Sequence, residues 1–203
     1  MRIYTIIGGV NGTGKSSLAG VLKSERDDLG YIIDADKIAA ENHGNNLLAG
    51  KLAVEKIHHF IAEGITFSQE TTLSGHMVLH TIKEAKESNY QVHLFYVGLS
   101  SVEESLRRIQ NRVEKGGHSI PTEDVLRRYN DRFPSLTRIL PYCDKVKFYD
   151  NENQFCNAAE YRNGELVYTS QYHPQWLTEF EHYLTRQEYM EFETESEINT
   201  LQP

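Results

Sequence analysis

The sequence predicts an α/β fold in which one parallel sheet is covered by helices on both faces. Three observations predict it: strand-like runs alternate with helical patterns, a Gly-rich turn joins the first strand to the first helix, and 203 residues suit one domain with appendages. The expected strands are residues 3–7, 31–33, 65–68, 91–97 and 145–149. The expected helices are residues 16–24, 45–62, 76–87, 101–115, 122–140 and 175–190.

The turn after the first strand is a phosphate-binding motif. Residues 9–16 read GVNGTGKS and match G-x-x-x-x-G-K-[ST] in full. Such a loop turns backbone N–H groups toward phosphate oxygens, and the following helix adds its positive N-terminal end. The expected nucleotide-binding residues of the motif are Gly9, Asn11, Gly12, Thr13, Gly14, Lys15, Ser16 and Ser17. Lys15 is expected at the β- and γ-phosphates and Ser16 at Mg²⁺. The motif predicts a P-loop NTPase fold, and the lack of a guanine-reading Asn-Lys-x-Asp motif favours ATP.

Two aspartates follow the second predicted strand, at the edge where ligands gather in open α/β sheets. Asp34 and Asp36 point the same way, because side chains alternate along a strand. Asp36 is the candidate general base, which would orient an attacking hydroxyl and accept its proton. The alternative is that either aspartate only caps a helix that begins near Lys37.

An acid and three hydroxyls follow the third predicted strand. Glu70 is the candidate for holding Mg²⁺ through a water or for orienting substrate, and Thr71, Thr72 and Ser74 can hydrogen-bond a polar substrate. Capping of the next helix by Thr72 or Ser74 is the alternative, and it does not exclude substrate contact.

Seven arginines crowd the region after the fourth strand: Arg107, Arg108, Arg112, Arg127, Arg128, Arg132 and Arg138. Guanidinium groups match phosphate oxygens, and the Gly-Gly pair at 116–117 would let residues 103–138 close as a lid. Arg108 and Arg112 are favoured as phosphate ligands, with Arg128 next. His118 contacts phosphate or caps the hinge. Acidic residues are interleaved with these arginines, which also predicts ion pairs on a solvated helix face. Phosphate binding and such a solvated face are compatible.

The last part of the chain is expected to be an appendage. Asn151 follows the fifth predicted strand, where we expect it either to contact adenine or to occupy a turn. Residues 158–162 and 165–169 flank Asn163-Gly164, the strongest short hairpin signal. The expected division is a P-loop kinase core at 1–155, a packed hairpin and helix at 156–190, and a disordered tail at 191–203.

Composition argues against several classes of protein. A net charge of −8 predicts no general attraction to nucleic acid or to anionic membranes. Cys143 and Cys156 are the only cysteines, without zinc spacing, a cleavable leader or a long apolar span, so a cytoplasmic protein with reduced thiols is expected.

With these residues in order, the chain resembles the zeta toxin family of P-loop kinases. The interval from Lys15 to Asp36 is similar to the family's interval from loop lysine to catalytic aspartate. Residues 70–72 resemble its Glu-x-Thr motif, implying substrate or metal contact at Glu70 and Thr72, and its lid arginines look like Arg108 or Arg112. His118 departs from the pattern, since it stands three residues before Pro121, where a second lid arginine is expected. The resemblance implies an ATP-dependent kinase acting on the 3′-hydroxyl of UDP-N-acetylglucosamine or a related nucleotide sugar, and an antitoxin as partner.

The leading hypothesis is therefore a Mg²⁺-ATP kinase whose acceptor is a hydroxyl on a small polar metabolite, with a UDP-N-acetyl sugar as candidate. One alternative is a kinase that acts on a nucleic acid end or on another small molecule. The arginine-rich helices are the only support for a nucleic acid substrate. Another is a switch that binds nucleotide without kinase activity, for which Asp36 would be dispensable.

Overall fold

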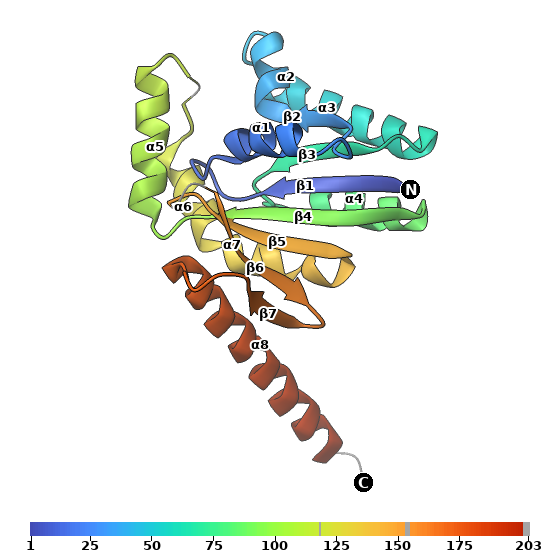
Figure 1. Ribbon diagram of the computed structural model, residues 1–203, viewed down its shortest axis with the longest axis vertical. Helices are drawn as coiled ribbons and strands as arrows, with labels where there is room; N and C mark the ends of the chain where they lie inside the picture. The colour runs from blue at the N-terminus through green and yellow to red at the C-terminus, as the bar shows by residue number, and fades with distance from the viewer. Residues whose placement is uncertain (118, 153–154, 201–203) are drawn as a thin grey trace.

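The computed structural model describes residues 1–117, 119–152 and 155–200, with side chains described as far as Gln187 (Figure 1). The strands are β1 (Arg2–Gly8), β2 (Tyr31–Asp34), β3 (Phe67–Thr71), β4 (Tyr90–Gly98), β5 (Lys145–Asp150), β6 (Cys156–Arg162) and β7 (Glu165–Tyr168). The helices are α1 (Lys15–Glu25), α2 (Ala35–Glu41), α3 (Asn46–Glu63), α4 (Met77–Glu87), α5 (Val102–Glu114), α6 (Thr122–Asn130), α7 (Arg132–Thr137), the 3₁₀ turn η1 (Leu140–Tyr142) and α8 (Gln175–Thr200).

All seven strands form one sheet, in the order β2-β3-β1-β4-β5-β6-β7. The first five strands are parallel, whereas β6 runs antiparallel to β5 and β7 antiparallel to β6. Asn163 and Gly164 make the turn between β6 and β7 with φ of 54° and 90°, as this residue pair predicts. The α/β fold is confirmed, with one difference: the terminal hairpin widens the parallel sheet and does not stand apart from it.

The two faces of the sheet enter separate cores, because alternate residues of a strand point to opposite sides. On β1, Tyr4 and Ile6 join the larger core with residues of α2, α3, α4, α7 and the start of α8, while Ile7 packs with residues of α1. Leu94 and Phe95 of β4 divide in the same way. Helices therefore cover both faces, as predicted.

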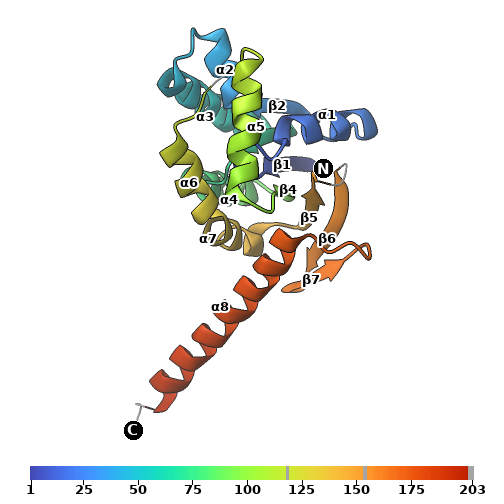
Figure 2. The ribbon, with the colours of Figure 1, turned by 90° about the vertical axis from the view of Figure 1, so that its left-hand side faces the viewer.

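The parallel strands all end at one edge of the sheet. In Figures 1 and 2, α5 and α6 stand across this edge, so the loops that follow β1, β2 and β3 are enclosed between them and the sheet. The edge is where the sequence predicts ligand binding.

Two boundaries near this edge differ from the expectation. β3 begins and ends later than predicted, so Glu70 lies within the strand, opposite Ile7 of β1 and Asp34 of β2. α2 was not among the expected helices, but it is the helix near Lys37 that the capping alternative required. It begins directly after β2 because the Asp34 carboxylate accepts hydrogen bonds from the backbone N–H groups of Asp36 and Lys37.

The long helix expected at 122–140 is instead divided into α6, α7 and η1. The break lies at Asp131, and Pro134 follows in the first turn of α7. Proline has no N–H, so it cannot continue a helix from the Asn130 carbonyl, but it is tolerated in a first turn. The division turns α6 toward the phosphate loop and α7 into the core.

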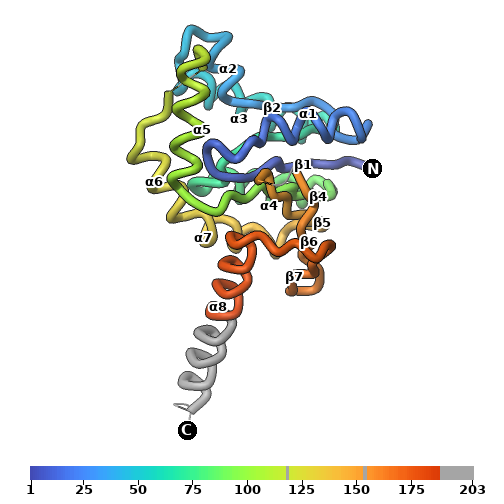
Figure 3. The backbone as a smooth tube through the Cα atoms, turned by 60° about the vertical axis from the view of Figure 1, so that its left-hand side comes forward, coloured from blue at the N-terminus to red at the C-terminus, as the bar shows by residue number. Residues whose placement is uncertain are grey.

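α8 is longer than expected and runs through Thr200, into the segment predicted as a disordered tail. In Figure 3 its coloured first turns lead away from the core. No proline or glycine lies between Pro174 and Pro203, and glutamate, a good helix former, recurs along the segment. Residues 201–203 lie outside the described residues, and the division into core and appendage remains a prediction. Among the described residues, no helix has both the length and the apolar character needed to cross a membrane.

Gly98, at the end of β4, lies against the indole of Trp176 from α8. A methyl group at this position would lie 2.0 Å from Cε2 of Trp176, whose ring also packs on Tyr96 and Phe148. We expect Gly98→Ala to lower the free energy of unfolding by about 2–3 kcal/mol, because a close-packed ring cannot yield without displacing its neighbours. Urea denaturation measures this change.

Gly50 of α3 supplies the control, since an added Cβ there meets nothing within 4 Å. Gly50→Ala should raise the free energy of unfolding by about 0.5–1 kcal/mol, because alanine restricts the unfolded chain more than glycine does. Equal midpoints for Gly98→Ala and the wild type would contradict the proposed packing.

Candidate active site

The phosphate-binding motif forms a loop between β1 and α1 that is held by its own hydrogen bonds. Thr13 Oγ1 donates to the Val10 carbonyl oxygen at 3.0 Å, and Lys15 Nζ donates to the same oxygen at 3.1 Å. Gly12 and Gly14 have φ of 76° and 92°, values that suit glycine. Because α1 begins at Lys15, the free N–H groups of its first turn adjoin the loop. The local geometry is that of an anion-binding loop.

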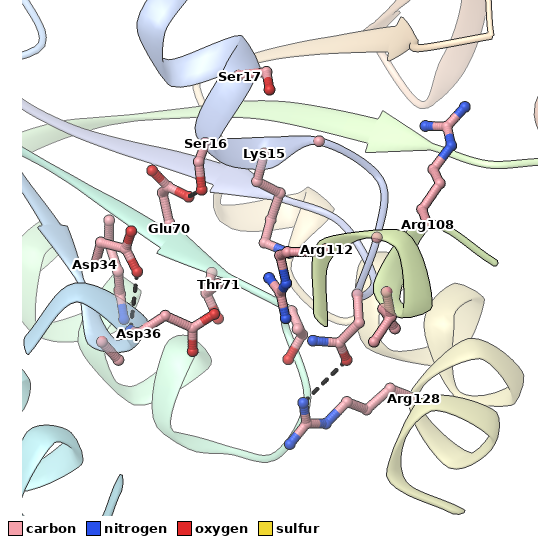
Figure 4. Close-up of a pocket in the computed structure, with 17 residues that line it drawn as sticks. Lys15, Ser16, Ser17, Asp34, Asp36, Glu70, Thr71, Arg108, Arg112 and Arg128 are labelled. Carbon is pink, nitrogen blue, oxygen red and sulfur yellow. Dashed lines mark hydrogen bonds between the residues drawn. The ribbon is translucent and has the colours of Figure 1, made fainter. Parts of the chain in front are cut away.

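A cavity of about 400 Å³ opens beside this loop. Figure 4 shows that side chains from the loop, from β2 and β3 and from α5 and α6 converge on it. The predicted site residues that line it are Asn11, Gly12, Gly14, Lys15, Ser16, Ser17, Asp36, Glu70, Thr71, Thr72, Arg108, Arg112 and Arg128. Gly9 and Thr13 shape the loop but do not line the cavity.

Ser16 and Glu70 form a pair that suits a magnesium ion. Glu70 Oε2 accepts a hydrogen bond from Ser16 Oγ at 2.6 Å, whereas its buried Oε1 has no partner in the described part of the chain. Burial raises the pKa of Glu70, and the bond from Ser16 opposes this rise. Mg²⁺ keeps several waters and takes one or two protein oxygens together with nucleotide phosphates. Among the described residues, no cluster of three or more acidic, histidine or cysteine side chains suited to a metal is found.

The two aspartates after β2 have different environments. Asp34 is buried, and its Oδ1 accepts the backbone N–H of Asp36 at 2.9 Å, so capping accounts for Asp34. Asp36 is exposed and its carboxylate accepts no hydrogen bond from the described residues. In Figure 4 the Asp36 side chain extends toward Thr71 and into the space between the labelled side chains. Asp36 is therefore the aspartate with a carboxylate available to a ligand.

Lys15 lies among opposing electrostatic influences. Burial lowers the pKa of Lys15 to about 8, while the carboxylates of Glu70, Asp36 and Asp34 act in the opposite direction and Arg112 adds to the lowering. Desolvation outweighs the attraction of three acids. A bound polyphosphate would add negative charge beside the Lys15 ammonium and so compensate for its loss of solvent.

The loop after β3 presents polar groups to the cavity. Thr71 Oγ1 accepts the backbone N–H of Leu73 at 3.1 Å, and Thr72 and Ser74 share a hydrogen bond of 2.8 Å between their hydroxyls. Thr71 and Thr72 line the cavity, where they can contact a ligand. The alternative that Thr72 or Ser74 caps the next helix is wrong, because the N-cap of α4 is His76 and no side chain caps it.

Gln69 is a cavity residue that sequence reasoning missed. Its Oε1 accepts a hydrogen bond of 2.5 Å from the Tyr4 hydroxyl, which burial keeps protonated by raising the pKa of Tyr4 far above its usual range. With Oε1 taken, Gln69 retains an N–H₂ donor for a ligand. Its position within β3, one residue before Glu70, was the available signal.

Three of the seven clustered arginines line the cavity, and they are the three favoured from the sequence. Arg112 extends into it beside Lys15 (Figure 4). Arg128 donates to Asn11 Oδ1 at 3.0 Å, and Arg108 donates to Glu104 Oε1 at 2.6 Å. The other four are held elsewhere: Arg107 by Glu104, Arg127 by Asp124, Arg132 by Glu179 and Arg138 by the Gly75 carbonyl.

Ser105 explains how α5 brings its arginines to the loop. This fully buried serine donates to the backbone carbonyl of Asn11 at 2.6 Å, and a Cβ on Gly12 would lie 2.8 Å from the Ser105 carbonyl oxygen. The loop and α5 are therefore in direct contact. A serine at one position of a polar helix carries no sequence signal for this role.

Two predicted contacts have other outcomes. Asn151 does not line the cavity, and its Nδ2 donates to the Thr13 carbonyl of the loop at 2.7 Å, so no adenine contact is assigned to this group. His118 lies outside the described residues.

A second cavity of about 360 Å³ adjoins the first and shares Asn11, Asp36 and Arg128 with it. Its remaining wall is formed by Ala35, Asn46, Ser119, Ile120, Pro121 and Asp124. Asp36 therefore lines two adjoining cavities, and Asn11 of the phosphate loop contributes to both.

Comparison with known proteins gives both a relative and a fold. No family model matches the chain. An uncharacterised protein of Haemophilus influenzae is 39% identical over 126 residues, which are 60% of this chain and 88% of that protein. A structure from the PezAT chromosomal toxin-antitoxin system of Streptococcus pneumoniae matches with a TM-score of 0.61 and 16% identity, over 92% of this chain and 85% of the other.

The complex of AvrRxo1-ORF1 and -ORF2 with ATP matches with a TM-score of 0.63 and 16% identity, over 83% of this chain. The chain spans only 61% of the AvrRxo1 chain that it matches. These similarities confirm the resemblance at the level of the fold. The chain belongs to one family with the uncharacterised Haemophilus influenzae protein, and its fold is similar to those of the PezAT structure and of AvrRxo1.

Proposed function

We propose that the chain is a Mg²⁺-ATP-dependent kinase that transfers the γ-phosphoryl group to a hydroxyl of a small polar metabolite. One observation supports this most strongly. A single cavity collects a phosphate loop with Lys15, the Ser16–Glu70 pair, the free carboxylate of Asp36 and three arginines. Phosphoryl transfer needs little else from a protein than such positioning and charge.

The nucleotide has its natural place on the loop side of the cavity. Backbone N–H groups of the loop and of the first turn of α1 would bind the phosphates, with Lys15 at the β- and γ-phosphates. Ser16 and Glu70 would hold Mg²⁺, which when bound neutralises charge on the phosphates. The match to a structure solved with ATP supports this nucleotide.

Asp36 would act on the acceptor. Its carboxylate orients the hydroxyl and takes the proton as the acceptor oxygen bonds to the γ-phosphorus. The bond from the γ-phosphorus to the β,γ-bridging oxygen breaks, and ADP leaves with that oxygen. The second cavity, which Asp36 also lines, would give the rest of the acceptor a place to bind.

Arg112, Arg108 and Arg128 would stabilise the charge that is shared by the transferred group, on helices that form a lid over the cavity. We expect Arg112→Ala to lower kcat by about 10- to 100-fold, the value of one or two hydrogen bonds to a charged group. Steady-state kinetics measures this.

Arg107 is the matched control for Arg112. It belongs to the same helix, but its guanidinium is exposed and paired with Glu104 outside the cavity. Arg107→Ala should leave kcat within about twofold of the wild type, since exposed ion pairs contribute little. Equal losses in both variants would indicate a general effect of positive charge.

The resemblance to zeta toxins makes a UDP-N-acetyl sugar the first acceptor to test. Purified protein is incubated with Mg²⁺-ATP and a panel of nucleotide sugars, with Asp36→Asn in parallel, and products are identified by mass spectrometry. A sugar that gains one phosphate only with the wild type supports the proposal. If the protein binds ATP but modifies none of the sugars, the proposed nucleotide site stands. The proposal that the acceptor is a nucleotide sugar is then overturned.

The proposal extends to a protein partner. The PezAT and AvrRxo1 matches come from two-component complexes, so an antitoxin-like protein that covers the cavity is the expected partner. Such a partner should bind in competition with ATP, which can be measured once a candidate from the same genome is purified.

A further inference from the structure

Asn151 contacts the phosphate loop from outside the cavity. Its Nδ2 donates to the Thr13 carbonyl oxygen at 2.7 Å, and a Cβ on Gly14 would lie 2.4 Å from the same nitrogen. Gly14 lines the cavity, whereas Asn151 does not. The amide therefore lies behind the loop, directly against the peptide that joins Thr13 to Gly14.

This contact fixes the direction of a backbone donor. In a trans peptide the C=O and the following N–H point in opposite directions, and the described residues contain no cis peptide. When Asn151 holds the Thr13 carbonyl on the outer side, the Gly14 N–H is turned toward the cavity. That N–H has no acceptor among the described residues, so it is available to a phosphate oxygen.

A buried network holds Asn151 in turn. The preceding residue, Asp150, is fully buried, and its Oδ1 accepts the indole N–H of Trp176 at 2.9 Å. Asp150 Oδ2 accepts the Tyr172 hydroxyl at 3.3 Å and the backbone N–H of Glu152 at 3.1 Å. Trp176 is itself 1% exposed. The start of α8 and the loop before it are thus linked to the phosphate loop through Asp150 and Asn151.

We propose that Asn151 is a positioning residue for the phosphate loop, held by Asp150 and Trp176, which orients the Gly14 N–H for nucleotide binding. The inference rests on the proposed nucleotide site. It gives the C-terminal segment, residues 156–187, a function beyond covering the sheet. It also replaces the expected contact between Asn151 and adenine with a contact to the loop backbone.

Asn151→Asp tests the inference, because aspartate has the same shape but no N–H donor. We expect Mg²⁺-ADP to bind about tenfold more weakly to this variant in isothermal titration calorimetry, since one oriented donor to a charged phosphate is lost. Thr169→Val is the control: it removes a bond of the same kind, from a side-chain hydroxyl to the Asn157 carbonyl at 2.6 Å, in the same segment but away from the loop. It should bind Mg²⁺-ADP as the wild type does.

Trp176 is the only tryptophan of the chain, so its fluorescence reports on the network directly. Mg²⁺-ADP should shift the emission of the wild type and of Thr169→Val, and the shift should be absent in Asn151→Asp at saturating nucleotide. Trp176→Phe, which keeps a ring but loses the indole N–H, should weaken Mg²⁺-ADP binding in the same direction as Asn151→Asp.

The outcomes separate the two proposals. Wild-type protein that binds no Mg²⁺-ADP would overturn the nucleotide site and this inference together. Normal wild-type binding with equal affinity in Asn151→Asp would overturn the inference alone. A weaker affinity in Asn151→Asp and in Thr169→Val alike would also overturn it, because the effect would then be one of general stability.

Discussion

Asp36→Asn is expected to lower kcat for phosphoryl transfer by about 10²- to 10⁴-fold, the usual contribution of a positioned general base. Asparagine keeps the shape and polarity of the side chain but cannot accept the hydroxyl proton. The KM for ATP should change little, because the Asp36 carboxylate bonds to none of the described loop residues. Steady-state kinetics with ATP and the acceptor varied in turn measures both quantities.

Asp34→Asn is the matched control for this change. Asp34 caps α2, and asparagine caps helices about as well as aspartate does. It should therefore retain most of the activity and nearly all of the stability. If Asp34→Asn loses transfer as completely as Asp36→Asn, the two carboxylates act together. If Asp36→Asn instead loses ATP binding while it stays folded, Asp36 serves the metal or the nucleotide and is not a base.

The arrangement of the site was predictable where it follows from backbone topology. The P-loop is a contiguous motif, and the groups after β2 and β3 meet beside it because parallel strands end at one edge. Asp36, Glu70 and Thr72 come together for this reason, although Glu70 lies in the strand and not after it. The hairpin turn was also predictable, since Asn163-Gly164 satisfies its geometry locally.

The rest of the site depends on packing that has no local signal. Arg108, Arg112 and Arg128 were favoured correctly from the sequence. The contact of Ser105 with the loop, which holds this side of α5 against the cavity, could not be predicted. Asn151 was expected at a base or in a turn, and it lies in a turn. Its contact with the loop could not be predicted, because Asp150 is anchored by a tryptophan 26 residues later in the chain. α2 is too short for a periodic pattern, and it is stabilised by the Asp34 cap and by the burial of Ile38 and Ala39 in the core.

Lys15→Met should lower kcat by about 10²- to 10³-fold and weaken ATP binding. The lysine supplies a charge at the transferred phosphoryl group, and removing one preorganised donor of this kind typically costs that much. Methionine has a similar length but no charge and no donor, so the loop keeps its packing while the contact to the phosphates is lost. Transfer to the acceptor and the Kd of Mg²⁺-ATP are the measurements.

The stability of this variant distinguishes a lost function from a lost fold. The lowered pKa of Lys15 means that the folded environment disfavours its charged form, since desolvation outweighs the attraction of Glu70, Asp36 and Asp34. An uncharged residue avoids that cost, so the melting temperature of Lys15→Met should equal or exceed that of the wild type, as is common where a site gives up stability for function. A clearly lower melting temperature would show that Lys15 instead stabilises the loop through its bond to Val10, and the loss of activity would then carry no information about the phosphates.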